Sequence, residues 1–117
     1  MITKLGKIKS AQFGIGGYQD AQAGFTFEVG GDGWGTIVSM GMVWAHLSKE
    51  EALADKNIKW AHEDRLKCIG ENGWTVIELM KAAKVSSLSK LVGIPVKVFF
   101  ESENGRNQGF EILKEVL

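Results

Sequence analysis

The sequence is poor in residues that cross-link the chain, and it has no long apolar run. A single cysteine, Cys68, cannot form a disulfide within the chain, which indicates a reducing compartment. Apolar runs such as residues 37–45 are far shorter than the ~20 residues that span a bilayer. The first residues lack the apolar run of a signal peptide. These absences predict a cytoplasmic protein without a membrane partner.

The chain also lacks net charge, although its charges are unevenly distributed. Fourteen Lys and Arg residues balance fourteen Asp and Glu residues, so no overall field draws the protein to nucleic acid or an anionic membrane. Lys4, Lys7 and Lys9 cluster near the start, and no other Lys or Arg occurs before Lys49. A basic groove would therefore need side chains from strands that are distant in sequence.

Length and composition predict one globular domain over residues 1–117. A chain of this length buries roughly two thirds of its unfolded surface, which is enough for one hydrophobic core. Hydrophobic residues make up 44% and charged residues 24%, as in an ordinary folded protein.

Hydrophobic patterns predict five strands and one main helix. Apolar residues recur at three- and four-residue steps over residues 62–84, with acidic residues near the start and lysines near the end, which is typical of a helix. Gly70 and Gly73 within it predict a close approach to a sheet or a neighbouring chain. Ser48 to Glu51 match the capping box of a short helix. Strands are predicted at residues 4–13, 25–29, 34–44, 96–101 and 110–116.

The predicted fold class is α+β, with element order β-β-β-α-β-β. Glycines at 30–33 and the Asn104-Gly105 pair predict hairpin turns, so most neighbouring strands should be antiparallel. An open five-stranded sheet on one main helix has this order, and so does the OB-fold, a five-stranded barrel that often binds oligonucleotides. The element order does not distinguish these two architectures.

Candidate catalytic and metal-binding residues form no recognisable constellation. The glycine clusters at 14–17 and 30–35 lack the following helix and Gly-Lys-Ser/Thr ending of a phosphate loop. His46, His62 and Cys68 are the bare minimum for zinc, and six-residue spacing on a helix turns His62 and Cys68 to different faces. No nucleophile motif occurs. We expect no enzymatic activity, no metal and no cofactor.

Single-stranded nucleic-acid binding is the most concrete functional hypothesis. It requires aromatic platforms for the bases and a basic groove for the phosphates. The alternative is that the aromatic residues mainly fill the core and the lysines are solvated. The candidate nucleic-acid contacts are Lys4, Lys7, Lys9, Lys97, Arg106 and Trp34.

A glycine-flanked segment between the first two strands is a candidate recognition loop. Tyr18, Gln19 and Asp20 occupy it, and binding residues concentrate on loops held by rigid strands. The alternative is a structural turn that Gln19 or Asp20 caps through its side chain.

A set of short motifs is distributed over nearly the whole chain. It begins with Gly-Tyr-Gln-Asp-Ala at residues 17–21 and continues at Gly24, Trp34-Gly35, Trp60, Glu63-Asp64-Arg65, Ala83-Lys84-Val85, Gly93-Ile94-Pro95-Val96, Phe100-Glu101 and Ile112-Leu113-Lys114-Glu115-Val116. With these motifs the sequence resembles a family of short proteins encoded by tailed bacteriophages and prophages, a family without an assigned activity. The resemblance implies a phage accessory protein that acts through binding, in DNA metabolism or host takeover.

A protein-interaction or assembly module is the rival hypothesis. Neutral charge and four tryptophans favour a surface that binds a host or phage protein, or a second copy of the chain in a homodimer. An open sheet would favour this module over nucleic-acid binding.

Overall fold

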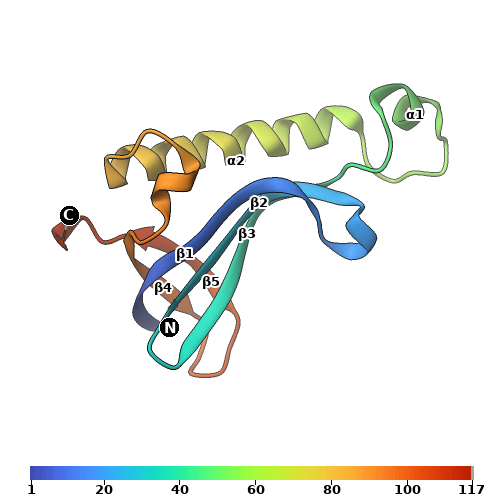
Figure 1. Ribbon diagram of the computed structural model, residues 1–117. Helices are drawn as coiled ribbons and strands as arrows, with labels where there is room; N and C mark the ends of the chain where they lie inside the picture. Colours follow the sequence, from blue (N-terminus) through green and yellow to red (C-terminus); the bar gives the residue numbers. More distant parts are fainter. Residues whose placement is uncertain (117) are drawn as a thin grey trace.

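The computed structural model describes residues 1–116 and confirms an α+β fold with one antiparallel sheet and one main helix (Figure 1). The strands are β1 (Ile2–Gly16), β2 (Gln22–Gly31), β3 (Trp34–Trp44), β4 (Pro95–Phe100) and β5 (Asn107–Ile112). The helices are α1 (Lys49–Ala54) and α2 (His62–Ala83), with single 3-10 turns η1 (Tyr18–Asp20), η2 (Leu88–Leu91) and η3 (Lys114–Val116).

β1 is the central strand of the sheet, whose order is β3-β2-β1-β4-β5. Its first half pairs with β4 and its second half with β2. Lys7 lies at the crossover, opposite Pro95 on one side and Gly30 on the other. The strand has 15 residues and is longer than the predicted 4–13, because both of its ends find partners in the ladder.

The sheet is open, so the closed-barrel alternative is wrong. The edge strands β3 and β5 have no backbone ladder between them. They are joined by the side chain of Asn107, whose Nδ2 donates to Thr36 Oγ1 and to the carbonyl oxygen of Ile37, each at 3.0 Å. The sheet therefore curls until its edges meet at one point.

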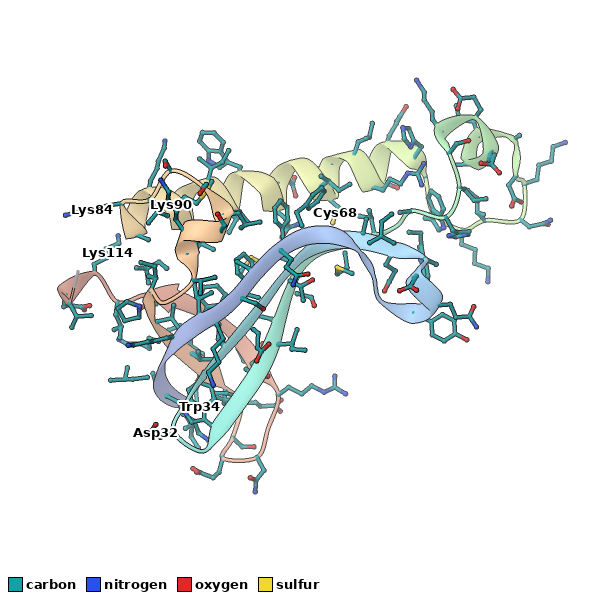
Figure 2. All side chains as sticks on the ribbon, in the orientation of Figure 1. Asp32, Trp34, Cys68, Lys84, Lys90 and Lys114 are labelled. Carbon is teal, nitrogen blue, oxygen red and sulfur yellow. The ribbon has the colours of Figure 1, made fainter. Side chains whose placement is uncertain are left out.

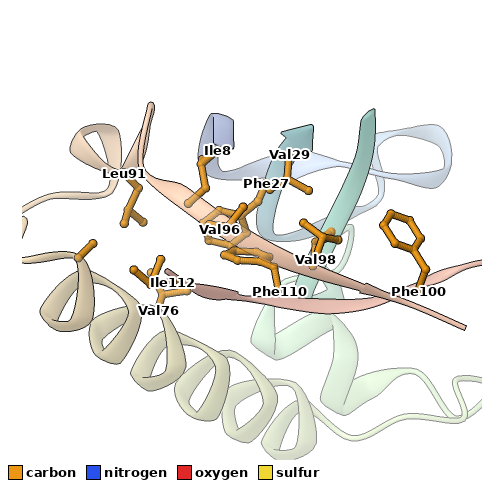
Figure 3. Close-up of a cluster of buried hydrophobic side chains, with 12 residues drawn as sticks. Ile8, Phe27, Val29, Val76, Leu91, Val96, Val98, Phe100, Phe110 and Ile112 are labelled. Atoms are coloured by element: carbon orange, nitrogen blue, oxygen red, sulfur yellow. The ribbon is translucent and has the colours of Figure 1, made fainter. Parts of the chain in front are cut away.

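The hydrophobic core lies between the inner face of the curled sheet, the C-terminal half of α2 and η2 (Figure 3). Val96, Val98 and Phe100 alternate inward along β4 and are buried. Phe27 packs edge-on against Phe110 with ring centroids 5.3 Å apart. Helix α2 contributes Val76 and Ala83, and η2 contributes Leu91.

The second half of β1 and its partners extend beyond this core. The radius of gyration is 16.0 Å, compared with roughly 13 Å for a compact domain of this length. In Figure 1 the long strands bend away beneath α2, and α1 lies at the far end. Phe13, opposite Phe25 at a ring distance of 4.7 Å, is half exposed. The molecule therefore has a packed body and an extended arm.

Element boundaries also differ from the prediction at the second and the last strands. β2 extends beyond the predicted 25–29 at both ends. β5 spans Asn107–Ile112, whereas residues 110–116 were predicted. The ladder between β4 and β5 ends at the Val96–Ile112 pair. The Leu113 N–H donates to the Pro95 carbonyl, and the chain then turns into η3. Helix α2 ends one residue before the predicted position, because Lys84 adopts a left-handed conformation as its C-cap.

The capping box predicted at residues 48–51 is confirmed. The Ser48 N–H donates to Glu51 Oε1, and the Glu51 N–H donates to Ser48 Oγ, both at 3.1 Å. The hydrogen bond from the Ser48 backbone is the largest cause of the lowered pKa of Glu51. The hydrogen bond with the Ser48 side chain lowers this pKa further. This contribution to stability is present above the unfolded-state pKa and is lost as pH falls through the lower, folded-state pKa.

Removing the Ser48 hydroxyl should change the titration of Glu51 only in part. In Ser48→Ala we expect the pKa of Glu51, measured by NMR of its side-chain carboxyl carbon, to rise part of the way toward its usual value, because the side-chain contribution of Ser48 is lost while its backbone N–H, the larger cause, remains. Ser89→Ala, outside α1, should leave the titration unchanged. A Glu51 pKa that is equal in the wild type and in Ser48→Ala would contradict this account.

Leu91 should be essential for packing. It is fully buried in η2, whereas Leu53 in α1 is 70% exposed. We expect Leu91→Ala to lower the free energy of unfolding by about 2–5 kcal/mol and Leu53→Ala by about 0.5 kcal/mol or less. Urea denaturation measures both. Equal losses would show that η2 does not pack as described.

Candidate functional site

The two faces of β1 separate the lysines that the sequence grouped together. Lys4 pairs with Val98, which points into the core, so Lys4 lies on the inner face. Lys7 pairs with Pro95 and lies on the outer face, away from the core. A β-bulge at Lys9 shifts the register between Ile8 and Ser10. The structure therefore brings Lys7 and Lys9 to one surface and leaves Lys4 on the other.

Lys4 and Trp34 close one end of the core. The Lys4 ammonium lies 5.7 Å from the Trp34 ring centroid and 5.3 Å from that of Phe100. The Trp34 and Phe100 rings meet edge to face at 5.6 Å. A side chain at Gly6 would come within 2.9 Å of the indole, so this glycine makes room for it. Figure 2 shows Trp34 near Asp32 at the β2–β3 turn. Trp34 is engaged in intramolecular packing.

The outer face of β1 is the floor of an open groove of about 730 Å³. Lys9 lies beside Gly30, where a built Cβ would come 3.4 Å from the Lys9 Cε. Leu5 is 64% exposed and Val92 is 51% exposed, although both are aliphatic. The lining comes from β1, the β2–β3 turn, the segment before β4 and the residue after β5. It includes Leu5, Lys7, Lys9, Asp32, Val92 and Leu113.

Lys97 and Arg106 lie outside the groove lining. Lys97 pairs with Leu5 on the outer face, and its Nζ lies 3.8 Å from Glu111 Oε1. Arg106 is exposed at the end of the β4–β5 turn, where its carbonyl accepts from the Glu101 N–H. Thus Lys97 extends the outer face next to the groove, and Arg106 lies on a separate turn.

The predicted recognition loop is an exposed turn at the end of the arm. Tyr18, Gln19 and Asp20 form η1, and all three are exposed. Gln19 and Asp20 have φ of 53° and 55°, a region that costs a non-glycine residue of order 1–3 kcal/mol. The hydrogen bonds of η1 join backbone groups: the Asp20 N–H donates to the Gly17 carbonyl, and the Ala21 N–H donates to the Tyr18 carbonyl. Nine residues of extended chain, about 30 Å, separate Lys9 from Tyr18.

A group around Arg65 holds the connection between β3 and α2, and the sequence analysis missed it. The Arg65 guanidinium donates to the carbonyl oxygens of Trp44 and Leu47 at 2.9 Å each. Its Nε donates to His62 Nδ1, and its guanidinium carbon lies 4.7 Å from the Trp60 ring centroid. The two carbonyls are 18 and 21 residues from Arg65, so no local pattern could have revealed these bonds.

The predicted histidines lie in this same region. The His46 ring lies between Trp44 and Trp60, with centroid distances of 5.9 and 6.5 Å. His62 accepts the bond from Arg65. Over residues 1–116, no three His, Cys, Asp or Glu side chains lie close enough to hold a metal ion. None of the helices in that range is long and apolar enough to cross a membrane.

Three further lysines lie toward one end of the folded chain. Figure 2 shows Lys84, Lys90 and Lys114 at the same end of the molecule, near the C-terminal end of α2. They belong to the cap of α2, to η2 and to η3. Six residues or more separate them in sequence, so the charge pattern did not identify them as a group.

Arg65 should hold the β3–α2 connection through its planar guanidinium. Lysine cannot reproduce the forked geometry. In Arg65→Lys we expect amide hydrogen exchange over residues 45–61 to accelerate about tenfold, while β4 remains protected. Arg106→Lys, on an exposed turn, is the matched control and should leave both regions unchanged. Unaltered exchange over 45–61 would exclude this role.

Comparisons with known proteins assign no function to these surfaces. No protein-family model, curated protein sequence or solved structure matches the chain. The lining of the outer groove is therefore the basis on which a function is proposed.

Proposed function

We propose that the chain is a non-enzymatic binding protein whose outer groove receives an extended, acidic and apolar segment of a protein partner. The single observation that carries this proposal is the groove itself, which combines exposed aliphatic side chains with two lysines. The resemblance to short phage and prophage proteins supports a host or phage protein as the partner. The open sheet favours such a module over a nucleic-acid-binding barrel.

The lining of the groove suits apolar side chains. Leu5 and Val92 are more than half exposed, and Pro95 and Leu113 complete an aliphatic surface. Exposed apolar side chains gathered in a concavity mark binding sites more often than scattered ones do. Gly93 is exposed and a Cβ there would meet nothing within 4 Å, so a partner chain can approach the backbone closely at this position.

The charge of the groove favours an acidic partner. Within residues 1–116 the recorded ion pairs join Lys67 with Glu71 and Lys97 with Glu111. Lys7 and Lys9 take part in neither pair, and Asp32 is the carboxylate of the lining. Two ammonium groups beside an aliphatic floor attract carboxylates and steer their approach.

Single-stranded nucleic acid is the second candidate ligand. Lys7, Lys97 and Phe99 share the outer face, so one ring and nearby ammonium groups are available there. Phe27 is fully buried, and Trp34 is packed against Phe100. Because base stacking requires exposed aromatic faces, the aliphatic groove supports a peptide better than a nucleic-acid strand.

NMR titration of the isotope-labelled full chain tests the proposal. The probes are an eight-residue peptide of alternating Glu and Leu, the same peptide with Lys in place of Glu, and a twelve-nucleotide oligo-dT. We expect the acidic peptide to shift the amides of residues 5–9, 92 and 93, because these line the groove. The basic peptide should leave them unchanged.

Charge reversal provides the matched control. We expect Lys7→Glu with Lys9→Glu to weaken binding of the acidic peptide at least tenfold at low salt. Lys49→Glu with Lys56→Glu, which alters the same net charge in and beside α1, should leave it within about twofold. No shifts from the acidic peptide at millimolar concentration would refute the proposal, and shifts from oligo-dT alone would assign the groove to nucleic acid.

A further inference from the structure

Helix α2 has a second apolar stripe on an exposed side. Leu66, Trp74 and Ile77 are 56%, 55% and 37% exposed, and Gly70 lies among them. They follow one another at steps of four, four and three residues, which places them on one side of a helix. The buried Val76 belongs to a different side of the same helix.

Gly70 has no role in packing within the chain. A Cβ at this position would meet nothing within 4 Å, whereas at Gly73 it would meet the Phe25 ring at 3.9 Å. Glycine inside a helix costs up to ~1 kcal/mol relative to alanine. The predicted close approach to the sheet thus applies to Gly73, while Gly70 leaves a gap in the exposed stripe between Leu66 and Trp74.

We propose that a second copy of this chain covers the stripe, with the two α2 helices antiparallel about a two-fold axis level with residue 72. A two-fold axis brings residue i of one copy beside residue j of the other, and residue j beside residue i. With i and j summing to 144, Gly70 of each copy faces Trp74 of the other. The large ring then fills the gap above the glycine.

The charges along α2 select this arrangement. The same symmetry places Glu63 beside Lys81 of the second copy, and Lys67 near Glu78 of the second copy. Each contact occurs twice, so four pairs of opposite charges flank the stripe. Parallel helices would instead place like charges together. Antiparallel helix dipoles also attract each other.

The side chains around the stripe are available for these contacts. Lys81 lies over Trp74, with its Nζ 5.3 Å from the ring centroid, and so stands at the edge of the stripe. Lys67 makes a 3.9 Å contact with Glu71 in which both side chains are about 70% exposed. Such a solvated pair contributes little and can reorganise when a partner approaches.

The size of the stripe sets the expected affinity. With 22 residues, α2 is about 33 Å long, so one helix pair gives an interface at the small end of the range for specific association. We therefore expect a reversible dimer with a Kd of the order of tens of micromolar at low salt.

Sedimentation analysis of the full chain from about 5 to 300 µM tests the proposal. We expect a monomer–dimer equilibrium that Trp74→Ala abolishes and that Glu63→Lys or Lys81→Glu each weakens about tenfold. The double variant, Glu63→Lys with Lys81→Glu, should recover to within about threefold of the wild type, because the two contacts are restored with exchanged signs.

The double variant also separates association from helix stability. Lysine at the start and glutamate at the end of α2 both oppose the helix dipole, so the double variant should have the least stable helix and yet recover dimerisation. Arg106→Glu, on the exposed β4–β5 turn, is the charge control and should associate like the wild type. A monomer throughout the concentration range, single reversals without effect, or a double variant that stays monomeric would each overturn the arrangement.

Discussion

The shared pairing of β1 is the constraint on which the rest of the structure depends. β1 must form backbone hydrogen bonds with β4 along its first half and with β2 along its second half, and Lys7 takes part in both ladders. Close approach at this point requires glycine, since a Cβ at Gly6 would lie 2.5 Å from the Gly30 carbonyl oxygen. Because β1 links both halves, Ile8 and Val29 join Val96 and Val98 in one core.

The same constraint produces the groove and the arm. Staggered partners leave the outer face of β1 between the β2–β3 turn and Pro95, and the open groove forms there. The second half of β1 extends past the body and holds η1 at its end. The stripe on α2 lies on an exposed side of the helix and shares no residue with the groove lining. The two proposed surfaces are therefore independent, and one chain can use both at once.

The four tryptophans show why composition alone could not identify the binding surface. Trp34 packs against Phe100 in the core, while Trp44 and Trp60 surround His46 beside the Arg65 group. Trp74 is the one whose side chain lies in an exposed stripe with Leu66 and Ile77. As aromatic residues, all four could serve in a prediction of base stacking. In the fold, burial and neighbouring side chains give each indole ring a different environment.

The sequence by itself determined the fold class, the main helix and β3, because alternation, helical spacing and the Ser48 capping box act over a few residues. It could not determine whether the sheet closes, because the edges β3 and β5 are about 70 residues apart in sequence, and in the fold Asn107 and Thr36 bring them together without a backbone ladder. Nor could it separate Lys4 from Lys7, whose faces depend on register with β4. Leu5, Val92 and Leu113 form a groove only after the chain has folded. Local patterns set the elements, whereas long-range pairing decided the surfaces.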